Sequence, residues 1–188
     1  MMGTDAFHRS LDYIEEQIHE ILKTVQQEDI QKINHLFFNA KRIFVYGAGR
    51  SGHVAKAFAI RLAHLGFQTF VIGETIGAPV KKGDLVCIVS GSGETIPAVM
   101  TAEIAKKLGA KLVVITGMKT ARIIQFADLA IILSADSPEK ERKVYAPLGT
   151  LFEASAWIFL DCIIAELMKN KKETEESMRS RHATLELP

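Results

Sequence analysis

The sequence has few cysteines, almost no net charge and no long apolar run free of charged residues. Its two cysteines, Cys87 and Cys162, lack the spacing of a metal or redox site, so we expect them to be small core residues in a reducing compartment. A net charge of +1 and a 24% share of charged residues argue against a nucleic-acid-binding patch and against disorder. The composition therefore predicts a soluble, cytoplasmic protein.

Neither a membrane span nor a secretion signal is indicated. The most apolar segment, residues 151–168, contains Glu153, Asp161 and Glu166, which a bilayer would tolerate poorly. Residues 1–26 carry acidic side chains throughout and lack the apolar block of a signal peptide. With 188 residues, 48% of them hydrophobic, and no low-complexity segment or linker, the chain suits one domain with a sizeable core.

The sequence does contain a short apolar run, Val86 to Val89, followed by a serine- and glycine-rich turn and a helical pattern that extends to Leu108. A short apolar run bounded by turn residues is typical of a buried strand in a parallel sheet. The turn would place backbone N–H groups and hydroxyls at the start of a helix, where the dipole favours an anion, and glycines would let that anion approach closely. We therefore assign phosphate binding to Ser90, Gly91, Ser92, Gly93, Glu94 and Thr95. The alternative is an ordinary turn in which Ser92 caps the helix.

Strand-like and helix-like segments alternate from residue 43 onwards. Short apolar strands that alternate with helices indicate a parallel sheet covered on both faces. We predict an α/β fold: a three-layer αβα sandwich of the flavodoxin-like type, with a five-stranded parallel sheet in the order 2-1-3-4-5. The predicted strands are 43–46, 69–72, 85–89, 112–115 and 129–133, and helices are expected at 5–27, 28–39, from the loop at 52 to 65, 95–108, 120–126 and 150–169.

The single domain would have three parts: a helical arm (1–40), the α/β core (41–170) and a polar tail (171–188). The arm would either cover the sheet or pack against another subunit. The charged segment 134–144, which contains Pro138, is expected to be a solvent-exposed loop.

A second glycine-rich loop, residues 47–52, follows the first predicted strand. In the strand order 2-1-3-4-5 the first and third strands are neighbours, so both loops would meet at the carboxyl edge, where such folds bind ligands. We assign Gly49, Arg50 and Ser51 to substrate binding, although Arg50 could equally pair with a carboxylate such as Glu74, and Ser51 could cap the helix. The spacing Gly-x-Gly-x-x-Gly also fits a dinucleotide fingerprint, with Glu74 as the ribose-binding acid. That interpretation leaves the hydroxyl-rich loop without a function, which favours a monophosphate.

Together these motifs resemble the sugar isomerase (SIS) domain, which carries similar loops to Gly47-Ala-Gly-Arg-Ser-Gly52 and Ser90-Gly-Ser-Gly-Glu-Thr95. Over nearly its whole length the chain resembles the family of 6-phospho-3-hexuloisomerases within that domain. Further stretches that carry the resemblance are 61–67, 146–153 and 181–186. The chain departs from the usual pattern at residues 73–79, in place of Gly-Glu-x-x-Thr-Pro, and at Thr184, in place of a frequent Asn.

The resemblance implies an isomerase that interconverts D-arabino-3-hexulose 6-phosphate and fructose 6-phosphate, in the ribulose monophosphate pathway of formaldehyde assimilation. Moving the carbonyl from C3 to C2 through an enediol needs a base, donors to the enediolate oxygens and a phosphate anchor, but no redox cofactor. The six histidines are scattered, so we expect no metal either. The resemblance also implies a homotetramer and a functional pairing with 3-hexulose-6-phosphate synthase. The alternatives are a non-catalytic sugar-phosphate sensor and an NAD(P)-dependent oxidoreductase.

Two residues are candidates for proton transfer. Glu153 lies on the apolar face of the last predicted helix and is, by the resemblance, the base; its spacing from Thr150 also fits a capping box. By the same resemblance, His182 in the tail assists proton movement or ring opening, in its own or a neighbouring subunit's site; alone, it would be a solvated tail residue. Ring opening should matter only from fructose 6-phosphate, because the 3-ketose has no favourable ring to open. His64 is expected to be a core or interface residue.

Overall fold

A five-stranded sheet forms the centre of the computed structural model, which describes residues 5–134 and 136–183. The strand order is β2-β1-β3-β4-β5 and every neighbouring pair is parallel, so the predicted topology is confirmed. All five residues of the central strand β3 are buried, as expected for an apolar run covered on both faces. The strands are β1 (Ile43–Gly47), β2 (Thr69–Val71), β3 (Leu85–Val89), β4 (Lys111–Thr116) and β5 (Leu129–Ile132).

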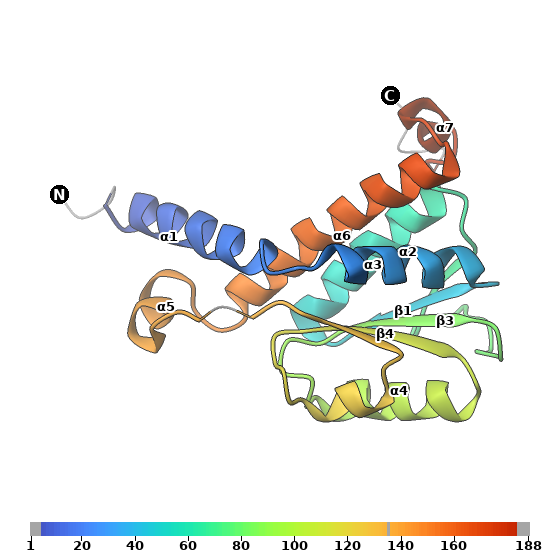
Figure 1. Cartoon of the computed structure of the whole chain (residues 1–188), viewed down its shortest axis with the longest axis horizontal. Helices are drawn as coiled ribbons and strands as arrows, with labels where there is room; N and C mark the ends of the chain where they lie inside the picture. The colour runs from blue at the N-terminus through green and yellow to red at the C-terminus, as the bar shows by residue number, and fades with distance from the viewer. Residues whose placement is uncertain (1–4, 135, 184–188) are drawn as a thin grey trace.

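Helices cover both faces of the sheet (Figure 1). Successive side chains of a strand point to opposite faces, so each apolar strand supplies two cores. In β3, for example, Cys87 packs beneath α2, α3 and α6, whereas Val86 and Ile88 pack beneath α4 and η1. The three-layer sandwich is therefore confirmed. The covering helices are α2 (Gln27–Asn39), α3 (Gly49–His64), α4 (Ile96–Lys107), the 3₁₀ helix η1 (Arg122–Phe126) and α6 (Thr150–Lys171).

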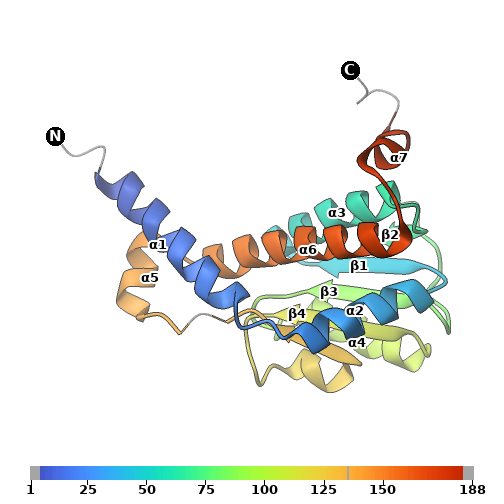
Figure 2. The same ribbon diagram turned by 45° about the horizontal axis from the view of Figure 1, so that its top comes forward.

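The helical arm divides into two parts with different surroundings. Helix α1 (Asp5–Leu22) ends earlier than predicted, at a turn in which the Thr24 hydroxyl donates to the Ile21 carbonyl at 2.7 Å. Helix α2 buries Ile33 and Phe37 and covers the sheet, whereas α1 extends away from the sheet alongside α5 (Glu139–Tyr145) (Figure 2). One of the two alternatives for the arm, covering the sheet, thus holds for α2 only.

The segment predicted as the loop 134–144 contains a short helix instead, α5 (Glu139–Tyr145). Pro138 is the N-cap residue, acidic side chains occupy the first turn and basic ones the last, which complements the helix dipole. Glu139 and Lys143 also form an ion pair one turn apart, at 2.8 Å. The prediction of a loop was wrong because it counted charge and proline but not their order along the chain.

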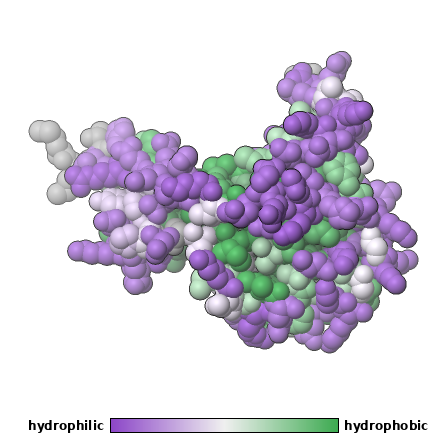
Figure 3. All heavy atoms as spheres, in the orientation of Figure 1, coloured by the Kyte–Doolittle hydropathy of each residue, from purple (hydrophilic) through white to green (hydrophobic). Residues whose placement is uncertain are grey.

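Beyond α6 the chain turns through Lys172, whose φ of 58° is left-handed, into the short helix α7 (Glu175–Arg179). In Figure 3 the lobe of α1 and α5 is largely hydrophilic, whereas hydrophobic residues reach the surface between this lobe and the α/β body. By length and composition, no one helix among the described residues suffices to cross a membrane; α5 and α6 meet that criterion only as a pair bent by 76°.

Candidate active site

The two glycine-containing loops lie side by side at the carboxyl edge of the sheet. Residues 47–52, here the glycine loop, follow β1, and residues 90–95, here the serine–glycine loop, follow β3. In the register of the sheet Gly47 is paired with Val89, the last residue before the serine–glycine loop. The predicted meeting of the loops is therefore observed, and each leads directly into a helix, α3 or α4.

The serine–glycine loop presents the start of α4 without a side-chain cap, as far as the described residues show. The N-cap residue is Thr95, so the alternative that Ser92 is the N-cap is wrong; the Ser92 hydroxyl instead accepts from the Glu94 N–H at 3.2 Å. The hydroxyls of Ser92 and Thr95 are 3.4 Å apart. An uncapped helix start beside two hydroxyls is a suitable anion site.

The fold of the serine–glycine loop depends on Gly93. Its φ is +62°, and a methyl group there would lie 2.4 Å from the Ala121 Cβ atom, so both conformation and space require glycine. The Gly93 carbonyl accepts from the Ile123 N–H at 3.2 Å, and the Glu94 carboxylate accepts from the Arg122 N–H at 2.7 Å. The Glu94 side chain thus anchors the loop to η1, while its backbone N–H is already bonded to the Ser92 hydroxyl.

In the glycine loop, close packing of strand against helix, rather than helix capping, explains why glycines occupy positions 47 and 52. A methyl group on Gly52 would lie 2.6 Å from the Gly47 carbonyl oxygen, so strand and helix approach each other at these glycines. The N-cap of α3 is Ala48, and Ser51 lies buried in the first turn, so the capping alternative for Ser51 is wrong. Gly49 begins the helix with a left-handed φ of +58°.

Glu153 projects from the first turn of α6 and forms an ion pair with Arg50. The Glu153 side chain is 13% exposed and that of Arg50 74% exposed, so a largely buried carboxylate meets a guanidinium that reaches into solvent. Arg50 thus pairs with a carboxylate, as one alternative had it, but the partner is not Glu74, which pairs with Lys56 at 2.6 Å. The elements α3 and α6, far apart in sequence, thereby bring two predicted site residues together.

The capping-box alternative for Glu153 is also wrong. The N-cap of α6 is Gly149 rather than Thr150, whose hydroxyl donates to the Pro147 carbonyl at 2.6 Å. Gly149 leaves space for the carboxylate, since a methyl group there would lie 3.1 Å from Oε1 of Glu153. The Glu153 carboxylate therefore lies against the N-cap residue and pairs with Arg50, without the side-chain capping bond that a capping box requires.

An open groove of about 430 Å³ surrounds this ion pair. Its wall includes Trp157, one turn after Glu153 and 46% exposed, and His53, one turn after Arg50. The groove therefore combines a carboxylate, a guanidinium and an imidazole with an apolar wall. Its lining residues are Arg50, His53, Val54, Thr150, Glu153, Ala154, Trp157 and Ile158.

His182 lies elsewhere in the same chain. Its ring stacks on that of the buried His64 with centroids 3.9 Å apart, at the carboxyl end of α3. Arg50 and His64 occupy opposite ends of that helix, about 21 Å apart at the usual rise per residue. Within one chain, the structure therefore does not bring His182 to Glu153; the expectation that His64 is a core residue agrees with its burial.

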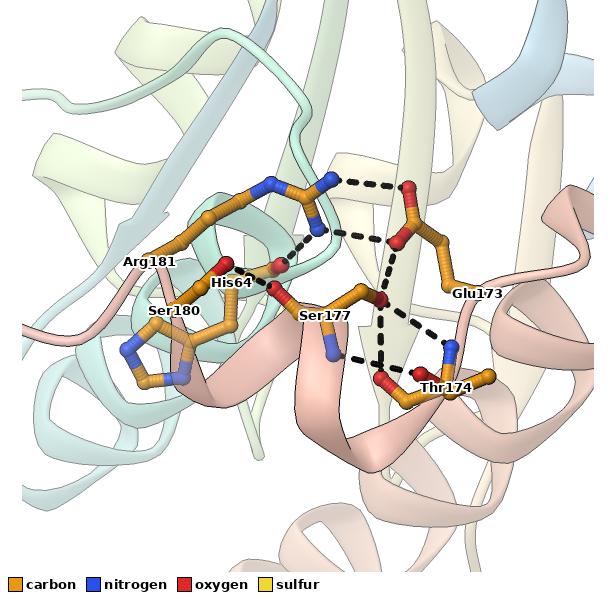
Figure 4. A network of polar contacts seen from close by, with 6 residues as sticks. All are labelled: His64, Glu173, Thr174, Ser177, Ser180 and Arg181. Atoms are coloured by element: carbon orange, nitrogen blue, oxygen red, sulfur yellow. Dashed lines mark hydrogen bonds and ion pairs between the residues drawn. The ribbon is translucent and has the colours of Figure 1, made fainter.

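A polar network holds the tail in this position (Figure 4). Arg181 donates to the His64 carbonyl at 2.9 Å and to both carboxylate oxygens of Glu173, at 2.9 and 3.0 Å. These bonds, with a further one from Ser177, hold the pKa of Glu173 below its ordinary value. Thr174 and Ser177 form a capping box on α7. Thr184 and the rest of the motif beyond Ala183 lie outside the described residues.

Comparison with known proteins identifies the family. The SIS domain matches residues 36–152. The chain belongs to the SIS domain family. The 3-hexulose-6-phosphate isomerase of Methanocaldococcus jannaschii is 40% identical over 146 residues, which cover 78% of this chain and 78% of that protein. The protein of the same name in Bacillus subtilis is 35% identical over 184 residues, which cover 95% of this chain and 100% of that protein.

Two solved structures share the fold. A Methanococcus jannaschii protein, whose structure infers a 3-hexulose-6-phosphate isomerase function, superposes with a TM-score of 0.84 at 36% identity, over 93% of this chain and 98% of that one. The Vibrio vulnificus NanR protein, solved with ManNAc-6P, shares the fold with a TM-score of 0.77 at 20% identity, over 95% of this chain and 67% of that one. The resemblance found in the motifs is confirmed, and this SIS protein is an enzyme, a phosphosugar isomerase.

Sequence reasoning missed His53, Thr150 and Trp157 in the groove of this SIS enzyme. A usable signal existed for all three, because residues three and four apart share one face of a helix. His53 is three residues after Arg50, Thr150 is three residues before Glu153, and Trp157 is four residues after Glu153. Helical periodicity applied from the two candidate residues would have found them.

Proposed function

We propose that this enzyme interconverts D-arabino-3-hexulose 6-phosphate and fructose 6-phosphate by proton transfer through an enediol, with Glu153 as the base. The observation that carries the proposal is the Glu153–Arg50 pair in an open groove at the edge that bears both loops. The names of the relatives supply the substrate class. We further propose, from the family resemblance of the motifs, that the reaction belongs to the ribulose monophosphate pathway, after the synthase that makes the 3-ketose.

The serine–glycine loop would hold the phosphate. The uncapped start of α4, with the hydroxyls of Ser92 and Thr95 beside it, offers N–H and O–H donors to an anion. Ser90, Gly91 and Gly93 complete the loop, with Gly49 and Ser51 on the neighbouring glycine loop. Fixing the phosphate leaves the carbonyl carbons as the part of the substrate that extends toward the groove.

Glu153 would remove the C2 proton of the 3-ketose phosphate and return it at C3, which gives fructose 6-phosphate, so that one carboxylate serves both halves of the reaction. The electron pair of the broken C–H bond forms the enediolate, whose negative charge needs a donor. Arg50 would supply that donor, because its guanidinium touches the carboxylate and is 74% exposed. Such a planar fork can contact the enediolate oxygen without ever losing its charge.

His182 would act on the site of a neighbouring subunit rather than on its own, since it lies at the far end of α3 from Arg50. Its proposed task is proton movement or ring opening of fructose 6-phosphate. This role requires an assembly, for which we propose a homotetramer in the cytoplasm. The chemistry proposed for the described residues uses neither a metal nor a redox cofactor.

The test is an isomerisation assay that starts from the 3-ketose phosphate in solvent deuterium. We expect turnover to fructose 6-phosphate with deuterium at C3, and near-complete loss of both in Glu153→Gln. Glu166→Gln, on the same helix but outside the groove, is the matched control and should keep full turnover. Substrate binding without turnover by the wild-type protein would instead indicate a sugar-phosphate sensor, and tight NAD(P)H binding an oxidoreductase.

A further inference from the structure

The Phe152 side chain connects the two parts of the protein that the proposed reaction must keep at a fixed distance. These are the serine–glycine loop and the first turn of α6, which carries Glu153. A methyl group built on Gly91 would lie 2.9 Å from Cδ1 of Phe152, and one built on Gly117 would lie 3.4 Å from Cδ2. The ring edges therefore rest directly on the backbone of the serine–glycine loop and on the residue that follows β4. Phe152 is also the residue immediately before Glu153 on α6.

The surface beneath the ring is held together by hydrogen bonds. The Gly117 N–H donates to the Gly91 carbonyl at 2.9 Å, and the Thr116 hydroxyl donates to the same oxygen at 3.3 Å. Thr116 is fully buried, and the backbone of Gly91 is thus fixed to the end of β4. A side chain at either glycine would separate the ring from this surface.

We infer that Phe152 is a positioning residue that sets the distance between the phosphate held by the serine–glycine loop and the carboxylate of Glu153. The inference rests on the proposed function. A rigid aromatic ring has two side-chain torsions, so packing it against the loop fixes the first turn of α6 relative to the phosphate. Proton transfer between C2 and C3 requires the base to stay within hydrogen-bond reach of both carbons, at one distance from the phosphate.

The experiment separates positioning from stability by comparing the same substitution at two places on α6. In Phe152→Leu we expect kcat to fall about tenfold or more, because a displacement of about 1 Å costs up to about 100-fold. The KM and the Kd for inorganic phosphate should stay within about threefold of wild type, because the donors of the loop remain. Phe159→Leu, in the buried core of the same helix, should lose stability but keep kcat at temperatures well below unfolding.

A double-mutant cycle tests the contact itself. Gly91→Ala should lower kcat by pushing the ring, and should cost less when Phe152 is already alanine, so that the two effects are not additive. If the alanine variants fail to fold, the kinetics of Phe152→Leu alone test the inference. Three results would overturn the inference while the proposed function stands. These are an unchanged kcat in Phe152→Leu, a decrease in kcat no larger than that of Phe159→Leu, and additive effects of the Gly91 and Phe152 substitutions on kcat. Absence of phosphate binding by the wild type, or turnover by Glu153→Gln, would overturn both.

Discussion

Replacing Gly149 with alanine should separate activity from stability in this enzyme. Gly149 is the N-cap of α6, with φ and ψ of −87° and 9°, a conformation that alanine also adopts. An added methyl group would lie 3.1 Å from Oε1 and 3.2 Å from Cδ of Glu153, so the carboxylate has to move by a few tenths of an ångström. The perturbation is thus aimed at one side chain, the proposed base.

The expected magnitudes follow from that geometry. Alanine is a poorer N-cap than glycine by up to about 1 kcal/mol, and the loss of a glycine from the unfolded chain returns about 0.4–1 kcal/mol. The unfolding free energy should therefore change by less than about 1 kcal/mol. Since a misplacement of about 1 Å costs up to about 100-fold in rate, a shift of a few tenths should lower kcat by about fourfold to tenfold.

The measurement pairs isomerisation kinetics with chemical denaturation, and Gly77→Ala is the control. A methyl group on Gly77 would have its nearest neighbour at 3.7 Å, an ordinary contact, so we expect normal kinetics there. If Gly149→Ala kept kcat within about twofold of wild type, the position of the Glu153 carboxylate would not limit the reaction as proposed.

Three further predictions concern the loop, the tail and the thiols. Gly93→Ala should lower the unfolding free energy by about 2–4 kcal/mol, because of the left-handed φ and the overlap with the residue before η1. An unchanged unfolding free energy in chemical denaturation would contradict this. Because the folded pKa of Glu173 lies below its ordinary value of 4.5, its bond to Arg181 should hold α7 fully above that pH and weaken as the pH falls through the folded value. Hydrogen exchange of α7 should show this loss of protection at acid pH, and Glu173→Gln should show none of the dependence. Burial raises the pKa of Cys87 to about 12, so a thiol reagent at pH 8 should label the exposed Cys162 alone in the native enzyme, and labelling of both would contradict it.

The strand order was predictable because it depends on local patterns. Five short apolar runs separated by helical segments leave few arrangements for a parallel sheet, and two glycine loops after the first and third strands select the edge that binds ligands. The helix α5 was predictable in principle from the order of Glu139, Lys143 and the proline before them. It was missed because composition was weighed without sequence order.

The sequence by itself determined the αβα layers, the two loops and the candidacy of Arg50 and Glu153, because these depend on periodicity, glycine spacing and motif. Only the tertiary structure decided that Arg50 pairs with Glu153 rather than with Glu74, since that contact joins residues far apart along the chain. It likewise decided that His182 stacks on His64, away from Glu153. Side-chain partners between distant segments follow from how α3 and α6 pack on the sheet, and no local pattern encodes that geometry.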